Sequence, residues 1–165
     1  MSRSKPATER WPDLAGHLDG TGHRLPVRIY YEDTDFSGFV YHANYLKFCE
    51  RARSDWLRLL GLHHHELMRA GDASSGMALG FAVRRLQADF FRPAIIDDVL
   101  EVLTVATAMS GARLELEQTI YRGDERLFEL QVTVAIVDGN GRPRRLPPDL
   151  SSRIAPRIAR QEQPK

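Results

Sequence analysis

The sequence predicts an α+β protein in which a curved antiparallel β-sheet wraps around one long central helix. Residues 45–60 carry apolar side chains at the three- and four-residue spacing of a long amphipathic helix. From about residue 77 onward, several runs instead alternate apolar and polar residues at a period of two, which is typical of strands. No further long helix is expected that could connect parallel strands, so a doubly wound parallel sheet is not expected. The apolar stripe of the helix must therefore be covered by one face of the antiparallel sheet.

The first expected strand covers residues 25–32, with Val27 and Ile29 on one face and Arg28 and Tyr30 on the other. The loop that follows extends to the start of the long helix.

The helix is expected to run for about five turns, because its apolar and charged residues fall on opposite sides. Gly61 lies just past the last periodic residue and is a typical helix stop. A shorter helix is expected at residues 65–70. The apolar stripe consists of Tyr45, Phe48, Cys49, Ala52, Trp56, Leu59 and Leu60.

The later strands are expected at residues 80–92, 99–108, 114–121 and 128–136. Glycine-containing turns separate the last three of these strands, and Asp138-Gly139-Asn140-Gly141 is a strong hairpin signal. A short final strand is expected at residues 144–146.

Three regions are predicted along the chain. Residues 1–23 are polar and are expected to form a flexible extension, docked by Trp11. Residues 24–152 form the folded domain, and residues 153–165 form a polar tail.

Charge and cysteine content limit the classes of protein. The formal net charge is +1, so the chain does not call for a nucleic-acid partner. A single cysteine excludes an intrachain disulfide framework. The N-terminus shows no apolar signal segment, and no apolar run is long enough to span a bilayer. We therefore expect a cytoplasmic protein.

The segment from Tyr30 to Tyr45 carries the candidate chemistry, because it places carboxylates, a glycine and a histidine just before the long helix. A helix N-terminus offers unpaired N–H groups and partial positive charge, which can stabilise an oxyanion. A carboxylate beside it supplies the nucleophile or base that acyl transfer requires. Gly38 would let the chain pass close to a ligand. Asp and Ser residues before a helix are, however, also common turn formers and caps.

The residues from Tyr30 to Arg53 closely resemble the Tol–Pal-associated acyl-CoA thioesterases, in the 4-hydroxybenzoyl-CoA thioesterase branch of the hotdog superfamily. The similar parts are Tyr-Tyr-Glu-Asp-Thr-Asp, Gly-Phe-Val-Tyr-His-Ala-Asn-Tyr and Glu-Arg-Ala-Arg. The resemblance extends from about Pro26 to Leu150 and includes Phe90-Phe91-Arg92-Pro93-Ala94 followed by Asp97-Asp98.

The resemblance implies a hotdog fold and an acyl-CoA thioesterase acting on short- or medium-chain or aryl substrates. Asp35 takes the position of the catalytic carboxylate and His42 that of a histidine near the helix start. The oxyanion would be bound by backbone N–H groups of Tyr41, His42 and Ala43. Asp35 would either attack the thioester carbon or activate a water, and the two routes stay open.

Further expectations concern the substrate and the assembly. Tyr31, Phe36 and Gly38 are expected to contact substrate, although bulky Phe36 departs from relatives, so acyl specificity is not carried over. Arg113 and Arg144 are candidates for the CoA phosphates, because Arg pairs well with phosphate. No cofactor is expected, since CoA is part of the substrate. The resemblance also implies a homo-oligomer built as a dimer of dimers, a location close to the inner membrane, and acyl carrier protein as a further partner.

Three other candidate sites are weaker. Asp33 to Gly38 opens like a calcium loop, but the twelfth position is Asn44 instead of a bidentate Glu. The run His63-His64-His65 has no metal-ligand spacing around it, so no metal site is expected. Cys49 lies on the apolar stripe, where an inert buried thiol is the default.

Two alternative functions remain at this point. A hotdog hydratase or dehydratase acting on a thioester could use Asp35 and His42 as its acid/base pair. A non-catalytic acyl-CoA-binding protein would bind the ester without turnover.

Overall fold

The computed structural model describes residues 16–70 and 78–159. In this part of the chain, one antiparallel sheet of six strands has the order β1-β2-β4-β5-β6-β3. The strands are β1 His17–Leu18, β2 His23–Arg28, β3 Leu79–Phe90, β4 Val99–Ser110, β5 Arg113–Arg122 and β6 Glu125–Asp138. The helices are α2 His42–Leu59, α3 His64–Ala70 and α4 Pro148–Ile154, with 3-10 turns at Tyr31–Asp33 and Ala155–Arg157.

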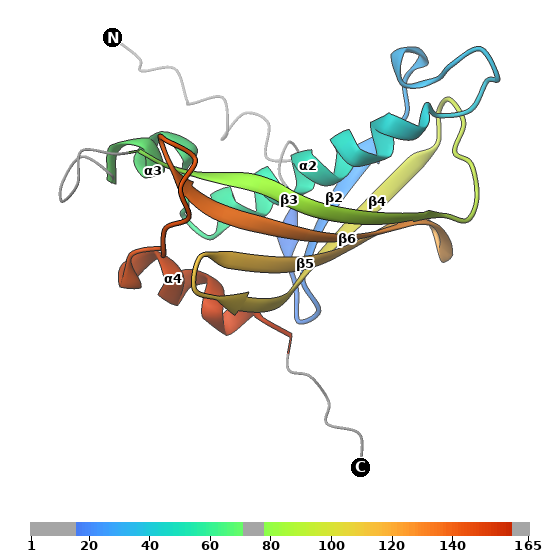
Figure 1. Ribbon diagram of the computed structural model, residues 1–165. Helices are drawn as coiled ribbons and strands as arrows, with labels where there is room; N and C mark the ends of the chain where they lie inside the picture. The colour runs from blue at the N-terminus through green and yellow to red at the C-terminus, as the bar shows by residue number, and fades with distance from the viewer. Residues whose placement is uncertain (1–15, 71–77, 160–165) are drawn as a thin grey trace, which may run out of the picture.

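The long helix α2 lies along one face of the sheet, as Figure 1 shows. Most of its apolar stripe is buried there, including Tyr45, Phe48 and Trp56, whereas Leu59 and Leu60 are only partly buried. The helix ends as expected before Gly61, which adopts a positive φ of 74°. The predicted α+β arrangement of one long helix against an antiparallel sheet is confirmed, and α3 follows where a shorter helix was expected.

The alternation predicted for residues 114–121 and 128–136 is also confirmed. On β5 and β6 the inward residues are buried and most of the residues between them are partly or fully exposed. Tyr45 stacks on Phe128 with ring centroids 5.3 Å apart, and Phe90 packs edge-on at 4.9 Å from Phe128. This aromatic cluster fixes the first turn and a half of α2 to the sheet.

Two predicted elements differ in the structure. The strand expected at 25–32 ends at Arg28. The Ile29 backbone still bonds Asp97 and Asp98, but the Tyr30 N–H then donates to the Asp33 Oδ2 and the chain enters the 3-10 turn Tyr31–Asp33. The strand expected at 144–146 is reduced to an isolated bridge between Val137 and Pro143. Proline has no N–H to extend a ladder, which limits pairing there.

The first and the last residues that the structure describes pair with the sheet. The short β1 pairs with β2, so the structured part begins within the region expected to be an extension. The boundary expected between residues 152 and 153 falls inside α4, where Ile154 is fully buried. Ile158 then forms a parallel bridge with Ala106 of β4. Trp11 lies outside the described residues, so its expected docking stays a prediction.

A buried polar contact fixes the β1–β2 hairpin to α2. His23 is fully buried, and its Nε2 lies 2.8 Å from the Asp55 Oδ2. Asp55 also accepts hydrogen bonds from the Gly16 N–H and from Arg58. Burial raises the pKa of the Asp55 carboxyl, but the bonds from Arg58, His23 and Gly16 outweigh burial and leave the pKa below its usual value.

We expect this contact to make the fold less stable in mild acid. Burial lowers the pKa of His23 below its ordinary 6.5, although Asp55 opposes the shift. Below pH 6.5 the unfolded chain therefore binds a proton that folded His23 does not, so stability is lost as pH falls. The free energy of unfolding, measured in urea at about pH 7.5 and about pH 5.5, should fall on acidification by less in His23→Asn than in the wild type. His65→Asn, at an exposed position, should keep the wild-type change, and an equal pH effect in all three proteins would contradict this account.

Candidate active site

The Asp35 loop is a tight turn at one end of the sheet. Thr34 and Val40 form an antiparallel bridge, and the Asp35 N–H donates to the Phe39 carbonyl at 3.0 Å. Across the turn, the Gly38 N–H donates to the Asp35 carbonyl at 3.0 Å. Gly38 has a φ of 83°, a conformation that glycine adopts without the steric cost of a Cβ. The sequence thus folds Asp35 into a defined position before the helix.

The Asp35 carboxylate is exposed, and one of its two oxygens accepts hydrogen bonds. Its Oδ1 accepts hydrogen bonds from the Ser37 N–H at 2.8 Å and from the Ser37 hydroxyl at 2.5 Å. Within the described residues its Oδ2 has no hydrogen-bond donor, so that oxygen can meet a ligand. The Ser37 bonds lower the pKa of Asp35, with a smaller contribution from His42. The group is therefore an anion at neutral pH.

The start of α2 supplies N–H groups close to this loop. His42 and Ala43 are the first two helical residues, so their N–H groups have no acceptor within the helix. No side chain caps this end of α2. The Tyr41 N–H, expected to join them, instead donates to the Asp33 carbonyl at 2.9 Å. Tyr41 is therefore not available as an oxyanion donor in this structure.

The His42 ring is exposed and tilted against the ring of Tyr41, with centroids 4.5 Å apart. His42 is the first residue of α2, and Asp35 lies in the turn that the Thr34–Val40 bridge closes before this helix. In the described part of the chain no hydrogen bond joins them. The structure thus brings His42 into the neighbourhood of Asp35 without making it a direct partner.

Asp33 organises the loop. Its Oδ2 accepts the Tyr30 N–H at 2.8 Å. Its carbonyl accepts both the Tyr41 N–H and the Asn44 side-chain amide, the latter at 2.8 Å. These bonds tie the 3-10 turn to the first turn of α2, and therefore hold Asp35 at the helix start.

Much of the surface around Asp35 is apolar. Tyr31 is 83% exposed and Phe36 is completely exposed, so neither lines an enclosed cavity of the single chain. Space beyond Gly38 is open, because an added Cβ would meet nothing within 4 Å. The exposed apolar side chains at this end include Tyr31, Phe36, Phe39, Phe90, Ile95 and Ile96.

The arginines predicted to bind phosphate lie elsewhere. Arg144 donates to the Asp138 Oδ2 at 2.9 Å and closes the hairpin after β6. Arg113 begins β5 and lines a cavity of about 940 Å³ on the outer face of the sheet. Arg122, at the other end of β5, bonds Asp98 beside the Asp35 loop. The two arginines are nine positions apart along the strand, so Arg113 lies about 30 Å from that end of the sheet.

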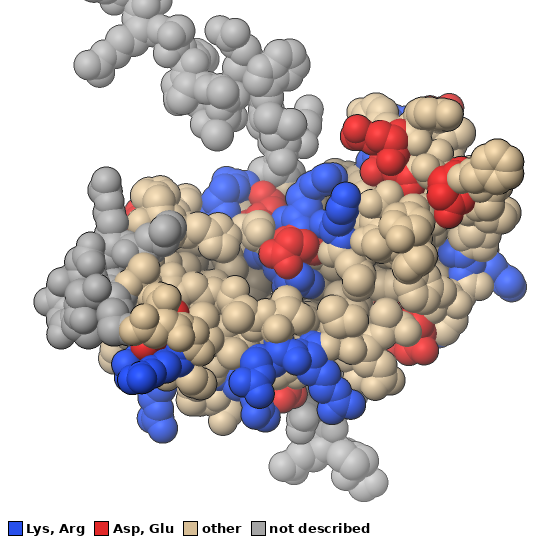
Figure 2. Space-filling model, turned by 45° about the horizontal axis from the view of Figure 1, so that its top comes forward, with Lys and Arg blue, Asp and Glu red and all other residues tan. Residues whose placement is uncertain are grey.

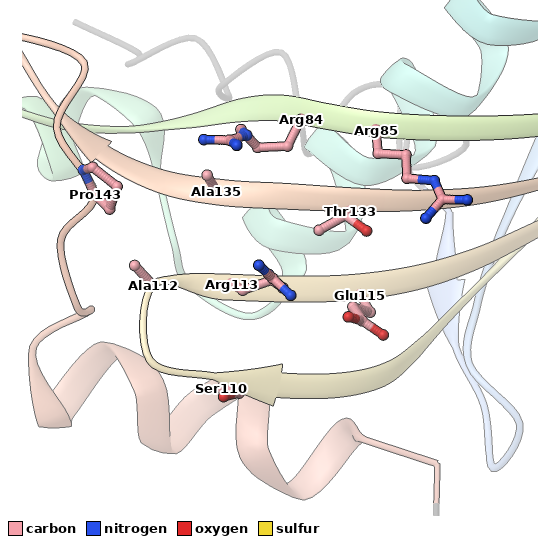
Figure 3. Close-up of a pocket in the computed structure, with 9 residues that line it drawn as sticks. All are labelled: Arg84, Arg85, Ser110, Ala112, Arg113, Glu115, Thr133, Ala135 and Pro143. Atoms are coloured by element: carbon pink, nitrogen blue, oxygen red, sulfur yellow. The ribbon is translucent and has the colours of Figure 1, made fainter.

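Arg84 and Arg85 line the same cavity and were not expected from the sequence. Consecutive residues of a regular strand point to opposite faces, but the register of β3 shifts between Val83 and Arg85. Figure 3 shows both side chains with Arg113 and Glu115 around the cavity. No ion pair within the described part of the chain engages these three guanidinium groups. Only the bulge, which the sequence pattern did not indicate, brings Arg84 to this face.

Other chemistry-bearing residues do not form sites. Among the described residues, no three His, Cys, Asp or Glu side chains are grouped to hold a metal ion. Cys49 is buried as expected, and burial raises the pKa of its thiol to about 12. It is therefore a neutral thiol at physiological pH and a poor nucleophile.

Comparison with known proteins defines the class. Residues 37–129 match the family described as the thioesterase superfamily, and the chain belongs to this family. The chain is 42% identical over 132 residues to the acyl-CoA thioester hydrolase YbgC of Escherichia coli O6:H1, covering 79% of this chain and 93% of that protein. It is 39% identical over 132 residues to the acyl-CoA thioesterase YbgC of Haemophilus influenzae, again covering 79% of this chain and 93% of that protein.

A solved structure, a probable thioesterase from Bartonella henselae, is 41% identical with a TM-score of 0.70 and covers 81% of this chain and 100% of that one. The hotdog arrangement expected for the fold agrees with such neighbours. The chain is a thioester hydrolase. No helix in residues 16–70 or 78–159 is long and apolar enough to cross a membrane.

Proposed function

We propose that this hydrolase cleaves the thioester of short- or medium-chain or aryl acyl-CoA, with Asp35 as its catalytic carboxylate. One observation carries the proposal. Asp35 is ionised, has one oxygen without a hydrogen-bond donor among the described residues, and lies just before a helix whose first N–H groups have no acceptor within the helix. The N–H groups of His42 and Ala43 would bind the oxyanion. The Asp35 carboxylate would meet the thioester carbon from the loop side.

Both chemical routes use this geometry. As a nucleophile, Asp35 attacks the thioester carbon to form a mixed anhydride while the C–S bond breaks. CoA leaves as a thiolate that takes a proton from solvent, and water then cleaves the anhydride to give the free acid and regenerate Asp35. As a general base, Asp35 takes a proton from the attacking water, the C–S bond breaks, and that proton passes to the departing CoA sulfur. His42 would orient Asp35 or hydrogen-bond the substrate. In either route activity falls as pH drops through the lowered pKa of Asp35, because the protonated carboxyl can do neither task.

The phosphates of the substrate would bind at Arg113, together with Arg84 and Arg85. Arg113 and Asp35 of one chain lie near opposite ends of the sheet, separated by roughly the diameter of a small domain. One substrate would therefore meet Asp35 of one subunit and Arg113 of another. The ion pair of Arg144 with Asp138 gives Arg144 a structural role instead.

The same proposal includes assembly into a homo-oligomer built as a dimer of dimers. The apolar side chains around Asp35 are exposed in the single chain, and such patches mark interaction surfaces. In the described sheet β3 pairs on one side only, and its Val83 and Leu86 are exposed. An open strand edge with apolar side chains is a template for pairing with a second copy.

The sequence motif supports the finer placement in the 4-hydroxybenzoyl-CoA branch, with a Tol–Pal association, a cytoplasmic location near the inner membrane and acyl carrier protein as a second acyl donor. Figure 2 shows basic and acidic side chains interspersed over the visible face, with basic ones gathered along its lower edge. This mixed charge gives that face no uniform field for nucleic acid.

A panel of acyl-CoAs tests the activity. We expect free thiol to be released from short-, medium-chain or aryl esters, while enoyl-CoA gains no water across its double bond. Hydration of enoyl-CoA without thiol release would identify a hydratase. Tight binding of every ester without turnover would identify a binding protein.

Arg113→Ala is expected to raise KM for acyl-CoA by about tenfold and leave kcat nearly unchanged, because it removes a phosphate contact remote from the thioester. The same acyl group on pantetheine, which lacks the nucleotide phosphates, should show equal kcat/KM for both proteins. Arg51→Ala, an exposed arginine on α2, serves as the matched control. An unchanged KM for acyl-CoA in Arg113→Ala would contradict this assignment.

A further inference from the structure

The connection between β3 and β4 packs against the Asp35 turn through its backbone. Figure 1 shows this connection and the β2–α2 connection at the same end of the sheet. The Val40 N–H donates to the Ala94 carbonyl at 2.9 Å, and Phe39 forms an antiparallel bridge with Ile95. The Phe39 carbonyl in turn accepts the Asp35 N–H. A continuous backbone path therefore leads from residues 94–95 to Asp35.

Two side chains hold residues 94 and 95 in place. The Ala94 N–H donates to the buried Tyr45 hydroxyl at 2.9 Å. The Ile95 N–H donates to the Asp98 Oδ2 at 3.0 Å. That same oxygen accepts Arg122 Nη1 at 2.7 Å, and Arg122 also bonds Glu125. The carboxylate of Asp98 thus joins the connection to β5.

The backbone of this connection is strained at Asp97, and backbone hydrogen bonds to Ile29 hold it in that conformation. Asp97 has a φ of 69°, the one positive value found for a non-glycine residue in the described chain. Hydrogen bonds on both sides fix it, from the Asp97 N–H to the Ile29 carbonyl and from the Ile29 N–H to the Asp98 carbonyl. Strained backbone of this kind persists where neighbours over-determine it, and it clusters at functional sites.

We infer that Asp98, paired with Arg122, is a positioning residue for Asp35. Asp98 fixes Ile95, Ile95 pairs with Phe39, and Phe39 holds the backbone of Asp35. Asp98 acts through this backbone path, and Tyr45 supports the same path at Ala94. The inference rests on the proposed role of Asp35, because the path matters for catalysis only if that carboxylate must be placed accurately.

Asp98→Asn is expected to lower kcat for acyl-CoA hydrolysis by about 10- to 100-fold, with KM within about twofold of the wild type, because a neutral amide loses the ion pair with Arg122 that holds this side chain against the Ile95 N–H. Misplacement of a catalytic group by about 1 Å costs a factor of this size. The acid limb of the kcat–pH profile should move to higher pH, because a looser turn weakens the Ser37 bonds that keep Asp35 ionised. Tyr45→Phe removes one oxygen but keeps the ring in the aromatic cluster, and it should lower kcat in the same direction.

Glu101→Gln is the matched control. It removes one of the two carboxylates that pair with Arg24 and leaves Asp19, just as Asp98→Asn removes one of the two that pair with Arg122 and leaves Glu125. Circular dichroism and thermal melting establish that each variant is folded, and Tyr45→Phe carries the test if Asp98→Asn is not. Wild-type kcat in folded Asp98→Asn and Tyr45→Phe overturns the inference, as does a raised KM with unchanged kcat.

Asp35→Asn, measured alongside, separates this inference from the proposed function. Full hydrolysis by Asp35→Asn removes the proposed role of Asp35 and the positioning role with it. Loss of hydrolysis in Asp35→Asn, with wild-type kcat in Asp98→Asn and Tyr45→Phe, removes the positioning role alone.

Discussion

Replacing Asp35 with Asn is expected to lower kcat for acyl-CoA hydrolysis by about 100- to 10 000-fold, the range attributed to a positioned acid or base. An amide is neither an anion that can attack the thioester carbon nor a base that can activate water. The Asn side chain keeps an oxygen for the Ser37 N–H and hydroxyl, so the turn should survive. Because the side chain at position 35 is exposed, the melting temperature should change little.

The matched control for this prediction is Glu32→Gln. Glu32 is an exposed carboxylate in the same loop, three residues before Asp35. Its substitution should leave kcat within about twofold of the wild type. Thiol release at saturating acyl-CoA measures both variants, and equal activity losses in the two would show a general charge effect instead of a specific role for Asp35.

Replacing Gln118 with Leu is expected to destabilise the fold by about 3 kcal/mol or more, because it leaves several buried polar groups without partners. Gln118 is fully buried on the inner face of β5. Its amide donates to the Cys49 carbonyl and to the Thr104 hydroxyl, both at 2.9 Å, and its oxygen accepts Arg53 Nη1 at 2.7 Å. Among the described residues, Arg53 would keep Glu50 as its remaining hydrogen-bond partner.

Urea unfolding of Gln118→Leu and Gln131→Leu compares the same substitution on two faces of the sheet. Gln131 lies exposed on the outer face of β6, so its loss should change the free energy of unfolding by no more than about 0.5 kcal/mol. If Gln118→Leu is as stable as Gln131→Leu, the inner network does not contribute as described.

The periodic parts of the fold were predictable because burial depends on which face of an element a residue occupies. The helix period placed Tyr45, Phe48 and Trp56 on one stripe, and the structure buries all three. The strand period placed Gln118 in line with Leu116 and Ile120, so the alternation put a polar residue inward. It could not show that Arg53 of α2 would reach this amide, because that contact depends on how the helix crosses the sheet.

The predictions that differ from the structure concern residues whose placement depends on single hydrogen bonds or on irregular backbone. The apolar pattern continued through Tyr30 and Tyr31, but the bond from the Tyr30 N–H to Asp33 turned the chain. The Tyr41 N–H was expected to face a ligand, yet the Asp33 carbonyl takes it. A bulge in β3 placed Arg84 beside Arg85, which no strand pattern indicates. The position of Asp35 could be predicted from the motif, whereas its Ser37 partner and its free Oδ2 could not.

The crystal structure of Asp35→Asn with an intact acyl-CoA would test most directly whether the thioester is broken at the start of α2. The thioester carbonyl oxygen should lie about 2.7–3.1 Å from the backbone nitrogen of His42 or Ala43. The carbonyl carbon should lie about 3–3.5 Å from the side chain at position 35, or be reached through one ordered water. A thioester bound away from this helix start, with the side chain at position 35 facing only solvent, would contradict the account.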